Sequence, residues 1–342
     1  MKRVTVKDIA YELNIAQSTV SKALSDKTGV SAEMKKNIHA ASERLGYKAN
    51  RLAQGLARKP IVIGIIMPNI WPEFYVPLEK GIKNQLKALS DYKIVARFKS
   101  IPSLHCEMEL ETAIDEFIEE QVSAVILCPV YNTSCGKYLE KLHKHNIELV
   151  LLGTDLANCE RLKCIRVDAY KAGKLAGEFI ELILHNSKKV TVFIGNRDMQ
   201  EHNEKCQGIA DALAHSDCTI VGIYETQDVP EIAYYITKKV LQEVPALESI
   251  YVATGNSIAV CKALIDLGME KQVKVVATDI FPEIKEYMDA NIIKSVIFQN
   301  PEQQGKIAVQ CLYEHFVENK ISVKEVLVHP ILVMRANIND YL

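Results

Sequence analysis

The sequence predicts two folds in one chain: an all-α helix-turn-helix headpiece, and then an α/β domain of two lobes with parallel, doubly wound sheets. The first 60 of the 342 residues show helix-like patterns and no β-rich run. From Ile61 onward, short apolar runs alternate with amphipathic helices, which is typical of parallel sheets covered by helices on both faces. About 280 residues is long for a single sheet of this kind, so we expect two lobes.

The headpiece is predicted to contain three short helices. Apolar side chains recur at helical spacing in residues 6–13, and after a break the pattern resumes in residues 17–25. A third helix is expected over about 32–45, with Ser31 as its N-cap and Gly46 at its end. Three short helices, of which the first two are joined by a tight turn, form the helix-turn-helix layout.

The second of these helices has the composition of a helix that contacts DNA. In the helix-turn-helix layout it enters the major groove, and its N-terminal side chains touch base edges. Gln17 and Ser18 lie at its front and Lys22 follows one turn later; glutamine can pair with adenine, and lysine can donate to guanine. Thr19 and Ser21 suit phosphate oxygens. An amphipathic surface helix with no special role is the alternative that spacing alone leaves open.

The charge of the chain is distributed unevenly. Residues 1–60 contain 12 Lys and Arg against 5 Asp and Glu, a net charge of +7 in a chain of net charge −2. A basic head on an acidic body suggests that the head contacts a polyanion. No run approaches about 18 uncharged apolar residues, and no uninterrupted apolar region follows the basic N-terminus, so we expect neither a membrane span nor a signal peptide. Nine scattered cysteines without ligand-like spacing favour reduced thiols in a cytoplasmic protein.

Residues 4–56, VTVKDIAYELNIAQSTVSKALSDKTGVSAEMKKNIHAASERLGYKANRLAQGL, resemble the DNA-binding headpiece of the LacI/GalR family of bacterial repressors. The resemblance has no gaps. It is carried by DIA at 8–10, STVS at 18–21, the GVS turn at 29–31 and NRLA at 50–53. It implies operator DNA as a partner.

The resemblance also implies the domain boundaries: a headpiece over residues 1–48, and a hinge helix and linker over 49–60. In the family the hinge helix folds on operator DNA, where a leucine wedges a base step apart in the minor groove; the matching residue is Leu56. An ordinary linker residue is the alternative for Leu56. The residues expected to contact DNA are Thr5, Gln17, Ser18, Thr19, Ser21, Lys22, Ser31, Asn50, Ala53 and Leu56.

The body, residues 61–342, resembles the effector domain that this family shares with periplasmic sugar-binding proteins. The resemblance assigns Asp279 and Gln299 to the cleft, where they would hydrogen-bond ligand hydroxyls. Asp279 follows an apolar strand, at the carboxyl end where parallel sheets bind ligands. The alternatives are an N-cap for Asp279 and a surface turn for Gln299. The lobes are expected over about 61–157 with 292–323, and over about 158–291 with 324–342.

Further cleft residues follow from the same resemblance. Phe74 and Tyr75 match an aromatic pair that stacks on ligands, with a place in the core as the alternative. Asn203 falls where the family often has an arginine, which argues against an anionic effector unless Arg197 or His202 substitutes for it. The effector-binding residues are therefore expected to be Phe74, Tyr75, Asn203, Asn256, Asp279 and Gln299.

The sequence thus predicts a DNA-binding transcription regulator, a repressor of carbohydrate-metabolism genes that is controlled by a sugar or sugar derivative in the interlobe cleft. We expect a homodimer, because one headpiece reads only half of a pseudo-palindromic operator. A transport sugar-binding protein is a second candidate, against which the basic head argues. An enzyme is a third, against which the absence of GxxxxGK[ST], GxGxxG, nucleophile-elbow and HExxH motifs argues. We expect no catalytic residues, cofactor, metal or membrane contact.

Overall fold

The computed structural model describes residues 4–24, 28–47, 59–102, 107–129, 136–156, 159–320 and 324–342. These residues form two compact units, one with the three N-terminal helices and the other with two six-stranded sheets. The expected combination of an all-α headpiece with an α/β domain of doubly wound sheets is confirmed. No helix in the described ranges is both long and apolar enough to cross a membrane, and none of the seven described cysteines is bridged.

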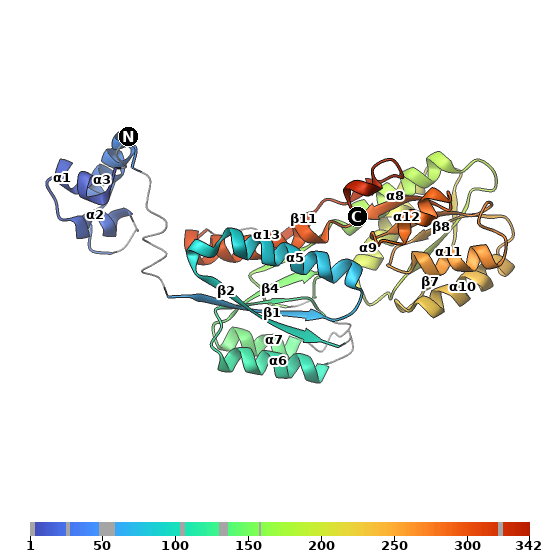
Figure 1. The fold of residues 1–342 in the computed structure, drawn as a ribbon, viewed down its shortest axis with the longest axis horizontal. Helices are drawn as coiled ribbons and strands as arrows, with labels where there is room; N and C mark the ends of the chain where they lie inside the picture. The colour runs from blue at the N-terminus through green and yellow to red at the C-terminus, as the bar shows by residue number, and fades with distance from the viewer. Residues whose placement is uncertain are drawn as a thin grey trace. The chain divides into compact units, whose positions relative to one another are not determined.

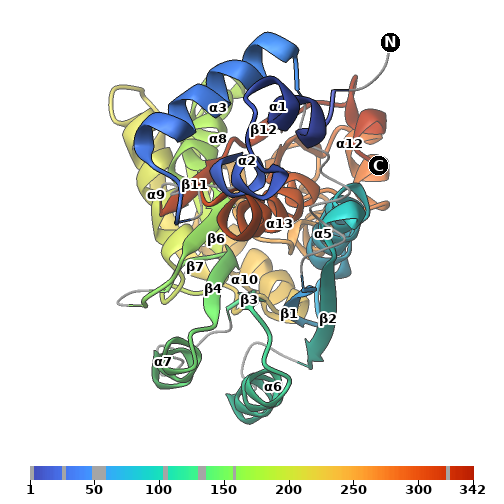
Figure 2. The ribbon, with the colours of Figure 1, turned by 90° about the vertical axis from the view of Figure 1, so that its left-hand side faces the viewer.

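The first unit is a three-helix arrangement around a small apolar core (Figure 2). Helix α1 spans Val6–Glu12, α2 spans Gln17–Leu24 and α3 spans Ala32–Leu45, close to the expected ranges. Asn14 adopts a left-handed backbone conformation with φ of 50°, which lets the chain turn sharply between α1 and α2. The buried core consists of Ile9, Ala10, Val20, Ala23, Ile38 and Ala41.

Local side-chain and backbone caps set the ends of these helices. The backbone N–H and the hydroxyl of Thr5 each donate to the Asp8 carboxylate over 2.7 Å, as in a capping box. The Ser31 hydroxyl accepts the backbone N–H of Met34 at 3.2 Å. Gly46 ends α3 with φ of 67°, a conformation that glycine adopts without steric cost. The predicted N-cap and the predicted end of the third helix are both confirmed.

The first lobe of the second unit contains a parallel sheet of strand order β11-β5-β4-β3-β1-β2. Its strands are buried at most central positions, because helices cover both faces: α5 and α13 on one side, α6 and α7 on the other (Figure 1). The bounds are β1 Ile61–Pro68, α5 Pro72–Ala88, the 3₁₀ turn Ser90–Tyr92, β2 Ile94–Ile101, α6 Glu107–Glu119, β3 Ala124–Leu127, α7 Gly136–Lys144, β4 Glu148–Gly153, β5 Lys163–Val167, α13 Pro301–Glu318 and β11 Glu325–Val328.

The second lobe contains a sheet of strand order β12-β10-β9-β8-β6-β7, in which only β12 runs antiparallel to its neighbour. Helices α8 and α9 pack on one face, and α10, α11 and α12 on the other. The bounds are α8 Ala169–Ile183, β6 Lys189–Ile194, α9 Gln200–Leu213, β7 Thr219–Glu225, α10 Pro230–Glu243, β8 Leu247–Val252, α11 Ser257–Asp266, β9 Lys274–Thr278, α12 Ile284–Asp289, β10 Ile293–Phe298, β12 Ile331–Val333 and the 3₁₀ turn Ile338–Asp340.

The lobe boundaries differ from those expected from the sequence. Strands β5 and β11, expected in the second lobe, pair with each other in the first sheet, where β5 also pairs with β4. Strand β10, expected in the first lobe, pairs with β9 in the second sheet. An apolar run shows that a strand is buried but not which strand lies beside it. The chain therefore crosses between the lobes at Asp168, at Gln299–Asn300 and at His329–Pro330.

Helices α8 and α9 pack unusually closely because glycines face the backbone of the neighbouring helix. A Cβ at Gly173 would lie 2.0 Å from the carbonyl oxygen of Lys205, and a Cβ at Gly208 would lie 2.0 Å from that of Tyr170. The α5–α13 pair has a similar contact at Gly81. A larger side chain at these positions would push the two helices apart.

Candidate functional site

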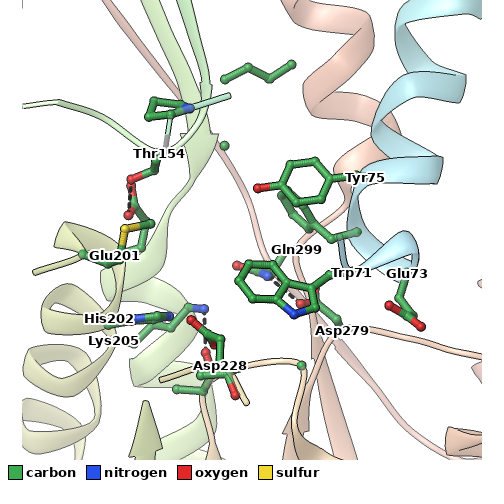
Figure 3. Close-up of a pocket in the computed structure, with 18 of the residues that line it drawn as sticks. Trp71, Glu73, Tyr75, Thr154, Glu201, His202, Lys205, Asp228, Asp279 and Gln299 are labelled. Carbon is green, nitrogen blue, oxygen red and sulfur yellow. Dashed lines mark hydrogen bonds between the residues drawn. The ribbon is translucent and has the colours of Figure 1, made fainter. Parts of the chain in front are cut away.

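A cavity of about 140 Å³ lies where the two lobes of the second unit face each other (Figure 3). Its walls come from the segments that follow β1, β3 and β4 in the first lobe, and β6, β7, β8, β9 and β10 in the second. These are the carboxyl ends of parallel strands, where open α/β sheets bind ligands. The volume corresponds to roughly ten water-sized positions, which is the scale of one small polar molecule.

Aromatic rings form one wall of the cavity. Trp71, Phe74 and Tyr75 come from the start of α5, and Phe281 faces them from the second lobe. The Phe74 and Tyr75 rings meet edge to face, with centroids 5.2 Å apart. Trp71, the only tryptophan of the chain, has φ of 42°, an uncommon conformation for a bulky residue that aims the indole into the cavity (Figure 3). The structure thus places the expected pair in the cavity, and adds Trp71 and Phe281, which the sequence reasoning missed.

Asp279 and Gln299 meet at the base of the cavity. The Gln299 side-chain amide donates to the two carboxylate oxygens of Asp279 at 2.8 and 3.0 Å. Asp279 is not the N-cap of α12, which begins only at Ile284. Burial raises the pKa of the Asp279 carboxyl, against the charge of Lys205 and the bond from Gln299. Both residues lie where the sequence placed them; their role in binding stays a prediction.

Helix α9 supplies the polar wall of the second lobe. Glu201, His202 and Lys205 share one helix face and line the cavity. The Lys205 ammonium donates to the Ala253 carbonyl at 2.9 Å. Burial lowers the pKa of Lys205, although nearby carboxylates oppose this shift, and burial also lowers the pKa of His202, which favours the neutral imidazole. The backbone N–H of Asn196 lies 3.1 Å from His202 Nδ1.

The structure does not bring two of the expected residues into this cavity. Asn203 is exposed, and its amide donates to the Arg197 carbonyl at 2.6 Å, because two positions after Glu201 the helix has turned by roughly 200°. Asn256 is buried, and its amide donates to the Thr226 hydroxyl at 3.1 Å. It lines an adjoining outer groove instead. The apolar pattern indicates a helix only from residue 203, so the cavity-facing positions before it carried no helical signal.

One carboxylate ties α9 to the first lobe at the cavity. The Glu201 side chain is buried, and one of its oxygens accepts the Thr154 hydroxyl from the loop after β4. The other oxygen accepts the backbone N–H of Asp155 at 3.2 Å. Burial raises the pKa of Glu201, and these hydrogen bonds oppose that shift. The second lobe is therefore linked to the first through a residue that also lines the cavity.

A second carboxylate of α9 forms a further link one turn along. The guanidinium of Arg166, on strand β5 of the first lobe, donates to both oxygens of Glu204, one of them at 3.1 Å from Nη2. Its Nε donates to Glu325 on β11 at 2.8 Å. The Arg166 side chain is only 6% exposed, whereas those of Glu204 and Glu325 are 26% and 38% exposed, so the network is desolvated mainly at the guanidinium. Movement of α9 would disturb both links between the lobes.

The first unit presents a polar helix face. On α2 the side chains of Gln17, Ser18, Ser21 and Lys22 are exposed, and Thr19 is half-buried. The opposite face packs into the headpiece core. A helix with one packed face and one free polar face is the arrangement that a major-groove reading helix requires.

The remaining residues expected to contact DNA have other structural roles or are not described. Thr5 and Ser31 cap α1 and α3, and a capping hydroxyl near a helix N-terminus is compatible with a phosphate contact. Asn50, Ala53 and Leu56, and with them the expected hinge helix, lie outside the described residues.

The comparison with known proteins agrees with this division of the chain. Residues 5–50 match the model of the lacI family of bacterial regulatory proteins, and residues 63–320 match a periplasmic binding protein domain. Catabolite control protein A of Staphylococcus aureus (strain N315) is 24% identical over 212 residues, which are 61% of this chain and 61% of that protein's length. Its counterpart in Priestia megaterium is 25% identical over 258 residues, 74% of each chain.

Solved structures resemble the second unit. A periplasmic solute-binding protein from Actinobacillus succinogenes 130z with bound D-allose has a TM-score of 0.73 at 20% identity, over 83% of this chain and 100% of that one. A putative LacI transcriptional regulator from Bacteroides fragilis has a TM-score of 0.71 at 16% identity, with the same coverage. At these identities the likeness shows the fold. The chain therefore belongs to the periplasmic binding protein domain family over residues 63–320, and a domain of the lacI family of bacterial regulatory proteins precedes it over residues 5–50.

Proposed function

We propose that this chain is a transcription regulator, a cytoplasmic repressor of carbohydrate-metabolism genes, whose operator affinity is set by a sugar or sugar derivative in the interlobe cavity. The observation that carries the proposal is that one chain contains both a helical headpiece and a ligand-binding type of α/β domain. A headpiece with a free polar helix face precedes a two-lobed domain whose cavity has aromatic and hydrogen-bonding walls. The names of the relatives and the D-allose bound to a structural neighbour support the sugar class. The proposal assigns binding to the cavity and no catalytic step.

Linkage explains how the cavity would control the headpiece. A ligand that touches both lobes stabilises one relative orientation of them, and can shift the equilibrium only by its differential affinity for the two orientations. Helix α9 is suited to transmit a change in lobe orientation. Its Glu201 lines the cavity, and its Glu204 binds Arg166 on β5, close to the point where the chain passes from the first lobe to the second. By reciprocity, operator DNA should change the effector affinity by the same factor.

The proposed active form is a homodimer on a pseudo-palindromic operator, because each headpiece would read one half-site. The edge strand β2 of the first lobe supports this, since Val95 and Phe98 are 38% and 41% exposed on it. Val76 on the neighbouring α5 is 58% exposed. Exposed apolar side chains on an edge strand are a common site of association between chains.

Operator selection tests the proposed function. We expect the full-length chain to enrich a pseudo-palindromic site from random-sequence DNA and to bind it with a strong salt dependence. Gln17→Ala and Lys22→Ala should each weaken binding to the selected site by roughly tenfold, since base contacts contribute about 1–3 kcal/mol. Lys87→Ala, an equal charge change in the second unit, serves as the control. A chain without sequence preference, or one that chemically alters a bound sugar, would contradict the proposal.

A further inference from the structure

The charges on the cavity walls indicate the charge of the ligand. We infer that the effector carries a protonated amine, as an amino sugar or an amino polyol does, and that phosphorylated and acidic sugars are disfavoured. The inference rests on the proposed function, because it takes the interlobe cavity as the effector site.

Carboxylates outnumber cations on the walls of this cavity. Among the described residues its lining contains no arginine, and burial lowers the pKa of His202. Burial also raises the pKa of Asp279 and of Glu201, and a cationic ligand group beside them would favour their charged forms. Five helices begin within two residues of a residue that lines the cavity (α5, α9, α10, α11 and α13), and each contributes roughly half a positive charge at its N-terminus. Together they supply about 2.5 positive charges, slightly less than the excess of three carboxylates, so the walls carry no surplus of positive charge for an anionic ligand. The charged lining residues are Glu73, Glu201, Asp228 and Asp279, against Lys205.

Lys205, the one lysine or arginine among the described residues of the lining, is not available to an anionic ligand. Lys205 is 3% exposed, and its ammonium already donates to the Ala253 carbonyl at 2.9 Å. The charges of Asp279, Glu201 and Asp228 act to raise the pKa of Lys205, against the lowering by its burial, so these carboxylates already interact with the ammonium. Proteins recognise phosphates and carboxylates with free arginine or lysine side chains, often in bidentate geometry. An anionic ligand would find no such partner here and would be repelled by the carboxylates.

Two of the carboxylates retain capacity for a ligand. Asp279 accepts its bonds from the Gln299 amide and has further lone-pair positions. Among the described residues the Glu73 carboxylate makes no hydrogen bond or ion pair, although Glu73 lines the cavity from the first turn of α5 (Figure 3). Glu73 is half-buried and also lines the adjoining outer groove, so its carboxylate lies at the mouth of the cavity. A ligand ammonium that reaches this position would pair with it.

The aromatic wall suits the same ligand. Trp71 precedes Glu73 by two residues, and Phe281 contributes a further ring from the second lobe. Aromatic faces attract a nearby cation and also cover the apolar face of a sugar ring. A ring bearing hydroxyls and one ammonium therefore finds aromatic faces, a carboxylate and hydrogen-bonding groups together in this cavity.

Calorimetry with matched ligands tests the inference. The full chain is titrated with the 2-amino, the neutral and the 6-phosphate forms of D-glucose, D-galactose and D-mannose, so that each set differs mainly in its charged group. We expect at least one amino sugar to bind about tenfold more tightly than its neutral parent, because a charge-assisted hydrogen bond is added, with no measurable binding of its phosphate. A phosphate or neutral parent that binds as tightly as the amine, or the failure of every amine to bind, overturns the inference.

A matched pair of variants locates the effect. Glu73→Gln keeps the size of the side chain and removes its charge; it should lower the amine affinity about tenfold and leave the neutral parent unchanged. Glu79→Gln, on the same helix but outside the cavity and paired with Lys83, should change neither. Equal weakening of amine and neutral sugar by Glu73→Gln counts against the inference. Operator binding by the ligand-free chain tests the proposed function separately. If the chain binds its operator but prefers a sugar phosphate to the amino sugar, the inference about the amine is wrong and the proposed function still holds.

Discussion

Replacing Gly208 with alanine should displace α9 and weaken both the fold and the cavity. A Cβ at this position would lie 2.0 Å from the Tyr170 carbonyl oxygen and 2.9 Å from the backbone nitrogen of Lys174. Ordinary contact begins at 3.4 Å, so the oxygen and the new methyl must separate by roughly 1.4 Å. Backbone atoms in the middle of a helix cannot rotate away as a side chain can, and therefore the two helices must shift as bodies.

The cost follows from two opposing effects. Overpacking a tight interior by one methyl group costs about 1–3 kcal/mol, and the backbone clash argues for the upper end. The better helix propensity of alanine returns about 1 kcal/mol. The net loss of about 2 kcal/mol corresponds to a fall in Tm of about 4–8 °C for a domain of this size. Because α9 carries Glu201 and Lys205 into the cavity, ligand affinity should fall as well.

Thermal unfolding followed by circular dichroism checks this expectation. Gly136→Ala is the matched control, since a Cβ there meets nothing within 4 Å at the start of α7. It should leave Tm unchanged or raise it slightly, because alanine is the better helix former. If Gly208→Ala melted at the temperature of the wild-type chain, or if both variants fell equally, the argument from close helix packing would be wrong.

Three further predictions concern polar contacts. Desolvation of the Glu248 carboxyl acts to raise its pKa, but bonds from three backbone N–H groups and from Lys274 outweigh this and lower the pKa to about 2. Its contribution to stability is thus complete above the ordinary pKa of 4.5 and is lost as the pH falls towards 2; Glu248→Gln should cost about 3 kcal/mol in urea unfolding at pH 7 and almost nothing at pH 2. Arg166→Met removes the guanidinium from the partly exposed Glu204 and Glu325 and should cost about 1.5–3 kcal/mol in the same assay, with an unchanged unfolding midpoint as the contrary result. Ser31→Ala removes the cap of α3 and should cost about 1 kcal/mol, seen as faster amide hydrogen exchange in that helix; unaltered exchange would show that the cap is not needed.

In the headpiece, signals from residues close together in the sequence were enough to predict the helices. Its three helices could be placed from the sequence because each depends on neighbours a few residues away: apolar side chains at helical spacing, the Ser31 hydroxyl on the Met34 N–H, and the left-handed Gly46. The strands of the second unit could also be recognised from a local signal, because a continuous apolar run indicates a strand that is buried on both faces. Asp279 and Gln299 could be expected in the cleft because they follow such strands.

The tertiary structure decided what depends on partners distant in the chain. The pairing of β11 with β5 joins segments about 160 residues apart, and no pattern within either strand encodes it. The face of α9 that meets the first lobe is likewise set by packing on α8, so that Lys205 lines the cavity while Asn203 points to solvent. The sequence by itself thus determined the elements and the ends of strands where a ligand would bind. The fold alone decided which side chains gather there, because hydrogen bonds between strands and contacts between helix faces form only once the chain has folded.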